Sequence, residues 1–309
     1  MTGVKPETQS FYESAVRLAV ERVLASLDEA LDLGRLARDA ALSPFHFHRI
    51  FRGMLGETPL ELHRRLRLER AASRLANPDT SVTGIAFDAG YDSHEAFSRV
   101  FRSFYGCSPS DFRHARLAER ASCARAPQFE IAARSSIHYP ADGSIPVITY
   151  NPGARAMNVE IEQLPERRVA TVRHVGPYSR ISEAFGRLGE LAGRAGLFQS
   201  RPEMLAIYHD DPETTPESEL SSDAGVVVSD GVKLPEGLAE QRLPAGRYAR
   251  TLHVGPYEEL GDAWARFMGQ WLPSSGERMG SSNTFEIYLN TPQDVPKKEL
   301  RTELYLPLA

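Results

Sequence analysis

Hydrophobic residues recur at helical spacing in the stretch from Ser43 to Gly56. Four apolar side chains take positions i, i+3, i+4 and i+7, which lie on one side of an α-helix: Phe47, Ile50, Phe51 and Met54. Ser43 is suited to cap this helix, and Pro44 needs no backbone donor at its first position. The opposite side would carry Phe45, His46, His48, Arg49 and Arg52. The pattern predicts an amphipathic helix with a polar, basic outer face.

The same spacing occurs just upstream over a shorter segment, in Leu33, Leu36, Ala37 and Ala40. Two short helices joined by a tight turn, the second with an exposed basic face, are typical of a helix-turn-helix. An ordinary pair of surface helices would give the same pattern, so one pair does not decide between the two interpretations.

A second copy of this pattern follows at an offset of fifty residues. The short helix recurs in Val82, Ile85, Ala86 and Ala89, Gly90 marks a turn, and the second helix recurs in Ser93, Phe97, Arg99, Val100 and Phe101. Between the copies, Pro59 opens a helical segment that ends before Asn77 and Pro78. At ~1.5 Å per residue this helix is ~27 Å long, and successive faces of a major groove lie ~34 Å apart. The sequence therefore predicts an all-α N-terminal domain with two helix-turn-helix motifs on a connecting helix.

Residues 14–116 resemble the DNA-binding domain of AraC/XylS transcription regulators. The run from Ile85 to Arg113, IAFDAGYDSHEAFSRVFRSFYGCSPSDFR, carries this resemblance. It implies binding to double-stranded promoter DNA. The side chains expected at the DNA come from both recognition helices: Phe45, His48, Arg49, Arg52, His94, Glu95, Ser98 and Arg99. Phe45 stands where well-studied relatives have a tryptophan, so their operator sequence does not carry over.

The five arginines of the connecting segment are a candidate phosphate-contacting patch, or else a solvated helix face: Arg64, Arg65, Arg67, Arg70 and Arg74. The DNA-binding domain is expected to occupy residues 1–116. Residues 117–156 are rich in proline and are expected to form a linker, with short strands near 129–131 and 147–150.

A second repeat, with a period near eighty residues, begins at Met157. The pentapeptide HVGPY occurs at 174–178 and again at 253–257, and LAIYHDDPETTPESEL at 205–220 corresponds to FEIYLNTPQDVPKKEL at 285–300. Each copy has the order strand, Gly-Pro turn, amphipathic helix, strand, proline-rich loop and strand. Two such units predict an α+β domain over 157–309, in which tandem repeats form an antiparallel sheet with helices on one face.

This tandem resembles the GyrI-like effector-binding domain, on the segments HVGPY, FEIYLN and ELRTELYLPL. The resemblance implies a pocket for a lipophilic small molecule. An AraC-type domain followed by this module resembles the Rob-type regulators of stress responses. The expected function is therefore a transcription regulator that responds to a small-molecule effector, with RNA polymerase as a further candidate partner. Stand-alone GyrI-like proteins include hydrolases, so an enzyme and a protein-binding module stay open as alternatives.

Residues that occur in only one copy of the repeat are candidates for function. Glu286 aligns with Ala206 and shares one side of its strand with Tyr288. Glu303 and Tyr305 share one side of the last strand, and Trp264 lies on the preceding helix. If the two strands are neighbours, these five residues would line one effector site. A carboxylate among aromatic rings favours a cationic ligand, although a nearby Arg or Lys could pair with it instead.

Composition and charge exclude several classes of protein. The chain has 309 residues, a net charge of −5 and only two cysteines, Cys107 and Cys123. This argues against a disulfide framework or a cysteine zinc site. Residues 1–125 carry +2 and the remainder −7, so DNA contact would depend on a local basic patch. There is no metal-ligand spacing, nucleotide-binding loop or serine-hydrolase motif, so neither a metal nor a cofactor is expected. No long apolar run or signal core is present, so a cytoplasmic protein without membrane contact is expected.

Overall fold

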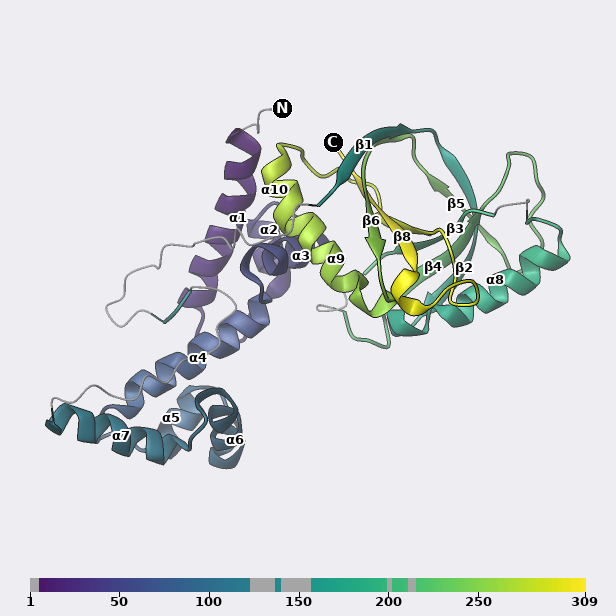
Figure 1. The fold of residues 1–309 in the computed structure, drawn as a ribbon. Coiled ribbons are helices and arrows are strands. Elements are labelled where there is room, and N and C mark those ends of the chain that lie inside the picture. Colours follow the sequence, from purple (N-terminus) through teal and green to yellow (C-terminus); the bar gives the residue numbers. More distant parts are fainter. Residues whose placement is uncertain (1–5, 123–136, 140–156, 199–201, 211–214) are drawn as a thin grey trace. The chain divides into compact units, whose positions relative to one another are not determined.

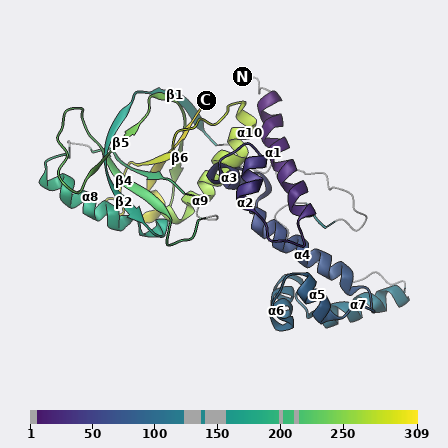
Figure 2. The same ribbon diagram turned by 180° about the vertical axis from the view of Figure 1, so that it is seen from behind.

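A computed structural model describes residues 1–309 apart from 1–5, 123–136, 140–156, 199–201 and 211–214. The expected strands near 129–131 and 147–150 lie outside the described residues. The chain forms two compact units (Figures 1 and 2). Unit 1 comprises residues 1–13, 43–53 and 153–309, and unit 2 comprises residues 14–42 and 54–152. The first candidate recognition helix thus belongs, through residues 43–53, to the same unit as the C-terminal sheet.

Unit 2 is helical. Helix α1 (Pro6–Ala25) belongs to unit 2 from residue 14 onward. The other helices of unit 2 are α2 (Leu33–Asp39), α4 (Pro59–Leu75), α5 (Val82–Asp88), α6 (His94–Tyr105) and α7 (Pro109–Ser122). Side chains cap several of the N-termini. Thr58 and Glu61 form a capping box at α4, and Ser93 accepts a hydrogen bond from the Ala96 amide at α6. At the end of α6, Gly106 adopts φ 72°, a left-handed conformation that costs glycine little.

One hydrophobic core cluster of unit 2 lies among α4, α5, α6 and α7. Its centre is the aromatic pair Phe97 and Phe101, and Phe101 packs edge-on against Phe112 at 5.4 Å. These residues are the apolar stripe that the sequence places on one side of each helix. Helix α7 continues past residue 116 to Ser122, and the described segment 137–139 contacts α4, where the Tyr139 amide donates to Glu69 at 2.6 Å.

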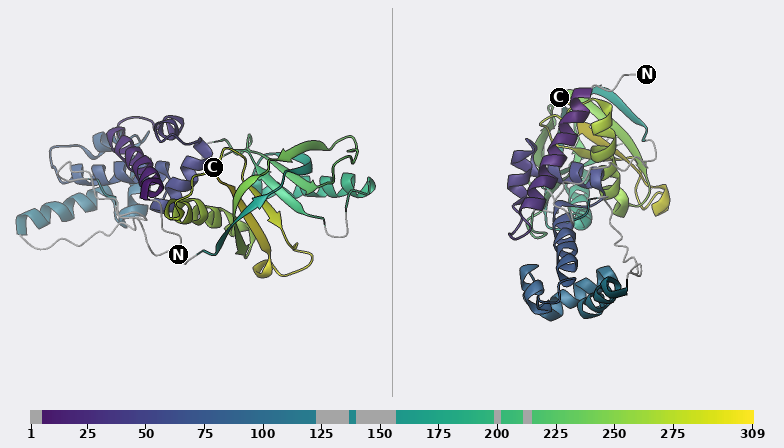
Figure 3. Two further views of the ribbon diagram at one scale, coloured as in Figure 1. Left: turned by 90° about the horizontal axis from the view of Figure 1, so that it is seen from above. Right: turned by 90° about the vertical axis from the view of Figure 1, so that its left-hand side faces the viewer.

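The described residues of unit 1 form one eight-stranded sheet whose paired strands are all antiparallel. Its strands are β1 (Val159–Leu164), β2 (Arg167–Val175), β3 (Met204–Tyr208), β4 (Ser221–Val227), β5 (Ala239–Leu243), β6 (Gly246–Val254), β7 (Phe285–Tyr288) and β8 (Arg301–Pro307). Their order is β1-β6-β8-β7-β3-β4-β2-β5, so β3 and β7 pair at the centre. The sheet curls strongly (Figure 3). Side chains that point into the curl form a hydrophobic core, which includes Phe285, Ile287 and Tyr305.

The other helices of unit 1 are α3 (Pro44–Leu55), α8 (Ser182–Arg194), α9 (Leu260–Arg266) and α10 (Leu272–Ser275). A π-helical segment, η3 (Phe267–Trp271), joins α9 to α10. Helix α8 packs on β2 and β4. Phe185 of α8 contacts Tyr288 and Trp264 of α9 contacts Glu286. Because Glu286 and Tyr288 lie on the same side of β7, α8 and α9 cover the same face of the sheet. The expected helical N-terminal region and the antiparallel α+β C-terminal region are both confirmed.

Candidate functional site

A buried carboxylate lies at the centre of the sheet face that α8 and α9 cover. Strand β7 presents Glu286 there, and only 2% of its surface is exposed. Its Oε1 accepts a hydrogen bond from the indole Nε1 of Trp264 at 2.7 Å. Its Oε2 accepts from the hydroxyls of Tyr288 at 2.8 Å and Tyr208 at 3.1 Å. Three neutral donors therefore hold this carboxylate in place.

Aromatic rings surround this cluster. Tyr178 packs on Tyr208 with ring centroids 4.8 Å apart, and both Phe185 and Tyr257 pack edge-on against Tyr288. Tyr208 occupies in β3 the place that Tyr288 occupies in β7, and the site expected from the sequence did not include it. That shared position, eighty residues away, was the only signal in the sequence that it could join Glu286.

Burial controls the ionisation of this cluster. It raises the pKa of Glu286, while the hydrogen bonds from Trp264 and Tyr288 and the charge of Arg49 act in the opposite direction. Burial and the neighbouring carboxylate also raise the pKa of Tyr208 and of Tyr288 well above the usual tyrosine value. The tyrosines are hydrogen-bond donors at neutral pH. The cluster can attract a positive charge and offer it ring faces, which is the chemistry of a site for an aromatic cation.

The expected single site of five residues requires a correction. Strands β7 and β8 are neighbours, but their register pairs Phe285 with Tyr305 and Ile287 with Glu303. Directly paired residues point to the same face, so Glu303 and Tyr305 lie on the face opposite to Glu286. There Tyr305 stacks on Phe285 with ring centroids 4.7 Å apart, and Glu303 accepts a hydrogen bond from Arg250 at 2.5 Å. The structure brings together only Glu286, Tyr288 and Trp264.

The second candidate recognition helix, α6, presents its polar side largely to solvent. Glu95 and Arg99 are exposed, and His94 and Ser98 are partly exposed one turn apart, with Ser98 Oγ 3.5 Å from His94 Nε2. The buried side of α6 carries Phe97 and Phe101. The four residues expected at the DNA therefore share the outward side of one helix.

The first candidate recognition helix, α3, is placed differently. His48 is buried, with 2% of its surface exposed, and burial lowers its pKa to about 4. It does not face outward in this conformation, contrary to expectation. Arg49 lies over the Trp264 ring at 5.2 Å, and Arg52 forms an ion pair with Asp262 at 3.0 Å. The side chain of Phe45 lies outside the described part of the chain.

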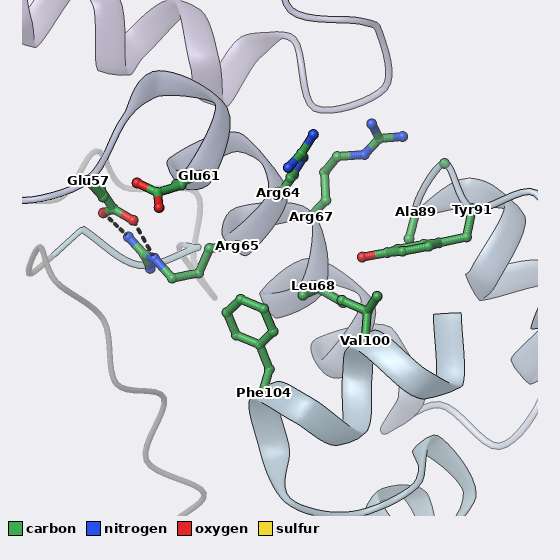
Figure 4. A pocket seen from close by; sticks show the side chains of 11 residues that line it. Glu57, Glu61, Arg64, Arg65, Arg67, Leu68, Ala89, Tyr91, Val100 and Phe104 are labelled. Atoms are coloured by element: carbon green, nitrogen blue, oxygen red, sulfur yellow. Dashed lines mark hydrogen bonds and ion pairs between the residues drawn. The ribbon is translucent and has the colours of Figure 1, made fainter. Parts of the chain in front are cut away.

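The expected arginine patch on α4 is reduced by internal pairing. Arg65 is buried and pairs with Glu57 and Glu69, each at 2.6 Å, so it is not a phosphate contact. Arg70 pairs with Asp28 and Arg74 with Asp88. Arg64 and Arg67 remain at the edge of a pocket of about 630 Å³, and they point away from the Glu57–Arg65 pair (Figure 4). Glu61 also lines the pocket, and its apolar and aromatic side chains include Leu68, Tyr91, Val100 and Phe104.

Two further properties of the described residues bear on function. No three His, Cys, Asp or Glu side chains among them gather closely enough to hold a metal ion. None of the helices within the described ranges combines the length and apolar character that a membrane crossing requires.

Comparison with known protein families finds a separate match for each of two parts of the chain. Residues 157–309 match the GyrI-like small molecule binding domain, and residues 36–115 match a helix-turn-helix domain. The regulatory protein SoxS of Salmonella typhimurium strain LT2 is 32% identical over 103 residues, which are 33% of this chain and 96% of SoxS. The chain belongs to the AraC-type regulators that carry a GyrI-like small-molecule-binding domain. The protein is thus a DNA-binding transcription regulator that responds to an effector, as expected from its sequence.

Other relatives share only the C-terminal part of this AraC-type regulator. A DNA gyrase inhibitor of Erwinia billingiae strain Eb661 is 32% identical over 158 residues, 50% of this chain and 98% of the inhibitor. The crystal structure of the EcmrR C-terminal domain is 22% identical with a TM-score of 0.44, and covers 50% of this chain and 99% of that domain.

Proposed function

We propose that the GyrI-like domain binds a lipophilic aromatic cation at Glu286, and that occupation of this site changes how the regulator binds promoter DNA. The buried Glu286 carboxylate among the rings of Trp264, Tyr208 and Tyr288 carries this proposal. An anion would meet like charge at low dielectric, whereas a cation gains both charge and ring-face contacts. Because Glu286 is 2% exposed, a ligand reaches the carboxylate only after the side chains that cover it move.

The DNA half of the proposal assigns one helix-turn-helix to α2–α3 and another to α5–α6. Bases would be read by Phe45, His48, Arg49 and Arg52 from the first, and by His94, Glu95, Ser98 and Arg99 from the second. The segmentation into residues 1–116, a linker over 117–156 and residues 157–309 belongs to the same proposal. It is supported by the limits of the two family matches, 36–115 and 157–309.

We also infer that β1–β4 and β5–β8 are tandem repeats. The strand order supports this inference, because exchanging β1 with β5, β2 with β6, β3 with β7 and β4 with β8 reverses the order without altering it. The repeats would meet at the β3–β7 pair, where Tyr208 and Tyr288 are 3.2 Å apart at their hydroxyls. The cation site would then lie on the internal pseudo-twofold axis, made asymmetric by Glu286 facing Ala206.

In this proposal the C-terminal domain binds its ligand without turnover. Both oxygens of Glu286 already accept hydrogen bonds from neutral donors, an arrangement that holds a carboxylate and does not present it to a water molecule. RNA polymerase is the proposed partner at the promoter. A second candidate function is binding to a protein target, favoured by the 32% identity to a DNA gyrase inhibitor over residues of this domain.

Calorimetric titration of the full chain with rhodamine 6G, an aromatic cation, tests the ligand site. Wild type should bind with a dissociation constant in the micromolar range, and Glu286→Gln should bind at least about tenfold more weakly. Glu303→Gln is the matched control, because it removes a carboxylate from the opposite face and should leave the affinity within about twofold. Equal binding by wild type and Glu286→Gln would remove Glu286 from the site. Catalytic consumption of an ester substrate would favour a hydrolase.

A further inference from the structure

Helix α3 packs directly on the GyrI-like domain, and the contact requires a glycine. A methyl group at Gly53 would lie 2.0 Å from the carbonyl oxygen of Ala265 and 2.5 Å from the Cα of Gly269. Real Cβ atoms do not approach other atoms so closely, so the two backbones meet at these positions only because Gly53 has no side chain. Gly269 belongs to η3, and π-helical segments are frequent at functional sites.

Two arginines that precede the glycine on α3 strengthen this contact. The guanidinium of Arg49 lies over the Trp264 ring at 5.2 Å, within the range of a cation–π interaction. Arg52 pairs with Asp262 at 3.0 Å. The start of α1 contacts the same domain, where the Met279 amide donates to the hydroxyl of Tyr12 at 3.2 Å. Helices from the N-terminal part of the sequence are thus held by the C-terminal domain at several points.

We propose that the surface formed by α9 and η3 is an internal docking site for α3 that competes with promoter DNA. The inference rests on the proposed function in one respect, namely that Arg49 and Arg52 contact DNA. A guanidinium group that lies on Trp264 or pairs with Asp262 is not available to a base or a phosphate. His48, expected at the same DNA face, is also buried in the docked helix.

Trp264 connects this docking site to the proposed effector site. The face of its ring carries Arg49, and its Nε1 donates to Glu286. A cation bound at Glu286 adds a positive charge near Arg49 and draws on the same carboxylate and ring. Binding of the cation should therefore weaken docking of α3 and increase affinity for DNA. By thermodynamic reciprocity, DNA should then strengthen cation binding by the same factor.

Gly53→Ala tests docking without removing a group that contacts DNA. Alanine favours the helix more than glycine does, so α3 should remain formed while its close approach to Ala265 is blocked. Gly261→Ala is the matched control, because it makes the same change on α9 next to Asp262 and no atom lies within 4 Å of the added methyl group. Asp262→Asn is a second, milder variant, with Glu190→Gln on α8 as its charge control.

The first readout does not involve DNA. The chain has two tryptophans, so a Trp271→Phe background leaves Trp264 as the single emitter. Trp264 is 1% exposed, and undocking in Gly53→Ala should shift its emission to longer wavelength. The second readout is affinity for a specific promoter fragment, which should increase at least threefold in Gly53→Ala and about twofold in Asp262→Asn. Neither control variant should change either readout.

An emission shift in Gly53→Ala without a gain in DNA affinity would overturn the competition, and no change in either readout would overturn the docking site. Arg49→Ala separates these failures from failure of the proposed function. If Arg49→Ala, combined with Gly53→Ala so that docking is already blocked, does not lower DNA affinity, Arg49 is not a DNA contact and the assignment of α3 falls instead. Absence of rhodamine 6G binding would affect only the link to the effector, because the Gly53→Ala comparison requires no ligand.

Discussion

The indole of Trp264 donates a hydrogen bond to the carboxylate of Glu286 at 2.7 Å, and its ring face carries the guanidinium of Arg49. One side chain thus contacts both the buried acid of the GyrI-like domain and a residue expected to read DNA. Through this contact, we expect protonation of Glu286 to affect the binding of both the cation and the DNA.

Affinity for a cation should depend on pH through Glu286. Only the carboxylate attracts the cation, so affinity is complete above the pKa of Glu286 in the free protein and falls as pH decreases through it. Because burial raises this pKa, the fall should begin at higher pH than the ordinary glutamate value of ~4.3. Titrations with rhodamine 6G between pH 8 and 5 measure the effect. A pH-independent affinity in wild type, equal to that of Glu286→Gln, would contradict the assignment.

The same shift has a consequence for stability. A carboxyl whose folded-state pKa is raised stabilises the fold most below its unfolded value, and that contribution is lost as pH rises to the folded pKa. Glu286→Gln should therefore be at least as stable as wild type at pH 7, with a thermal midpoint equal or higher. A marked drop in midpoint would show that the charged form of Glu286 supports the fold.

The contribution of His48 to the free energy of unfolding should depend on pH in the opposite direction. Burial lowers its folded pKa to about 4, below the unfolded value of ~6.5, so the unfolded chain binds more protons between these values. Stability should fall as pH decreases through this window, by up to ~1.4 kcal/mol per pH unit for this residue. The thermal midpoint of wild type should therefore fall relative to that of His48→Leu as pH decreases from 7 to 5. The exposed His114, replaced by leucine, is the control. Parallel curves for His48→Leu and wild type would contradict the prediction.

Arg65→Ala should unfold unit 2 more easily without altering DNA recognition directly. It would leave Glu57 and Glu69 buried without the guanidinium that pairs with both, a loss that costs ~3–5 kcal/mol. Urea denaturation measures this cost. Arg64→Ala, an exposed neighbour on the same helix, should change stability by less than ~0.5 kcal/mol. Similar stabilities of the two variants would mean that the buried carboxylates find another partner.

Arg99 and Arg64 should differ in how their loss affects DNA binding. If Arg99 reads a guanine edge from α6, Arg99→Ala costs ~1–3 kcal/mol on a specific site and much less on random DNA. If Arg64 contacts a phosphate, Arg64→Ala weakens binding to every sequence alike and lowers the salt slope by about one. Fluorescence anisotropy at several salt concentrations separates the two. Equal losses on specific and random DNA would make Arg99 a phosphate contact.

Much of the fold could be predicted from local pattern. The apolar stripes of α3 and α6 and the cap at Ser93 are short-range features, because helix formation depends on residues three and four positions apart. The repeats at offsets of fifty and eighty residues were visible because the same short segments recur in the sequence. Glu286 could be selected because the other copy of the repeat has Ala206 at its position, and Tyr288 because it shares a side of the strand with Glu286. The structure brings both together with Trp264, which lies on the preceding helix.

Register and burial were decided by tertiary structure. The sequence left open whether β7 and β8 are neighbours. The pairing of Phe285 with Tyr305 makes them neighbours and places Glu303 on the other face, since a shift of one residue exchanges the faces of a strand. An arginine or histidine on the polar side of a helix has the same pattern whether it faces solvent or a partner. The burial of Arg65 and His48, and the contact of Gly53 with Ala265, depend on groups distant in sequence, so only the folded chain could show them.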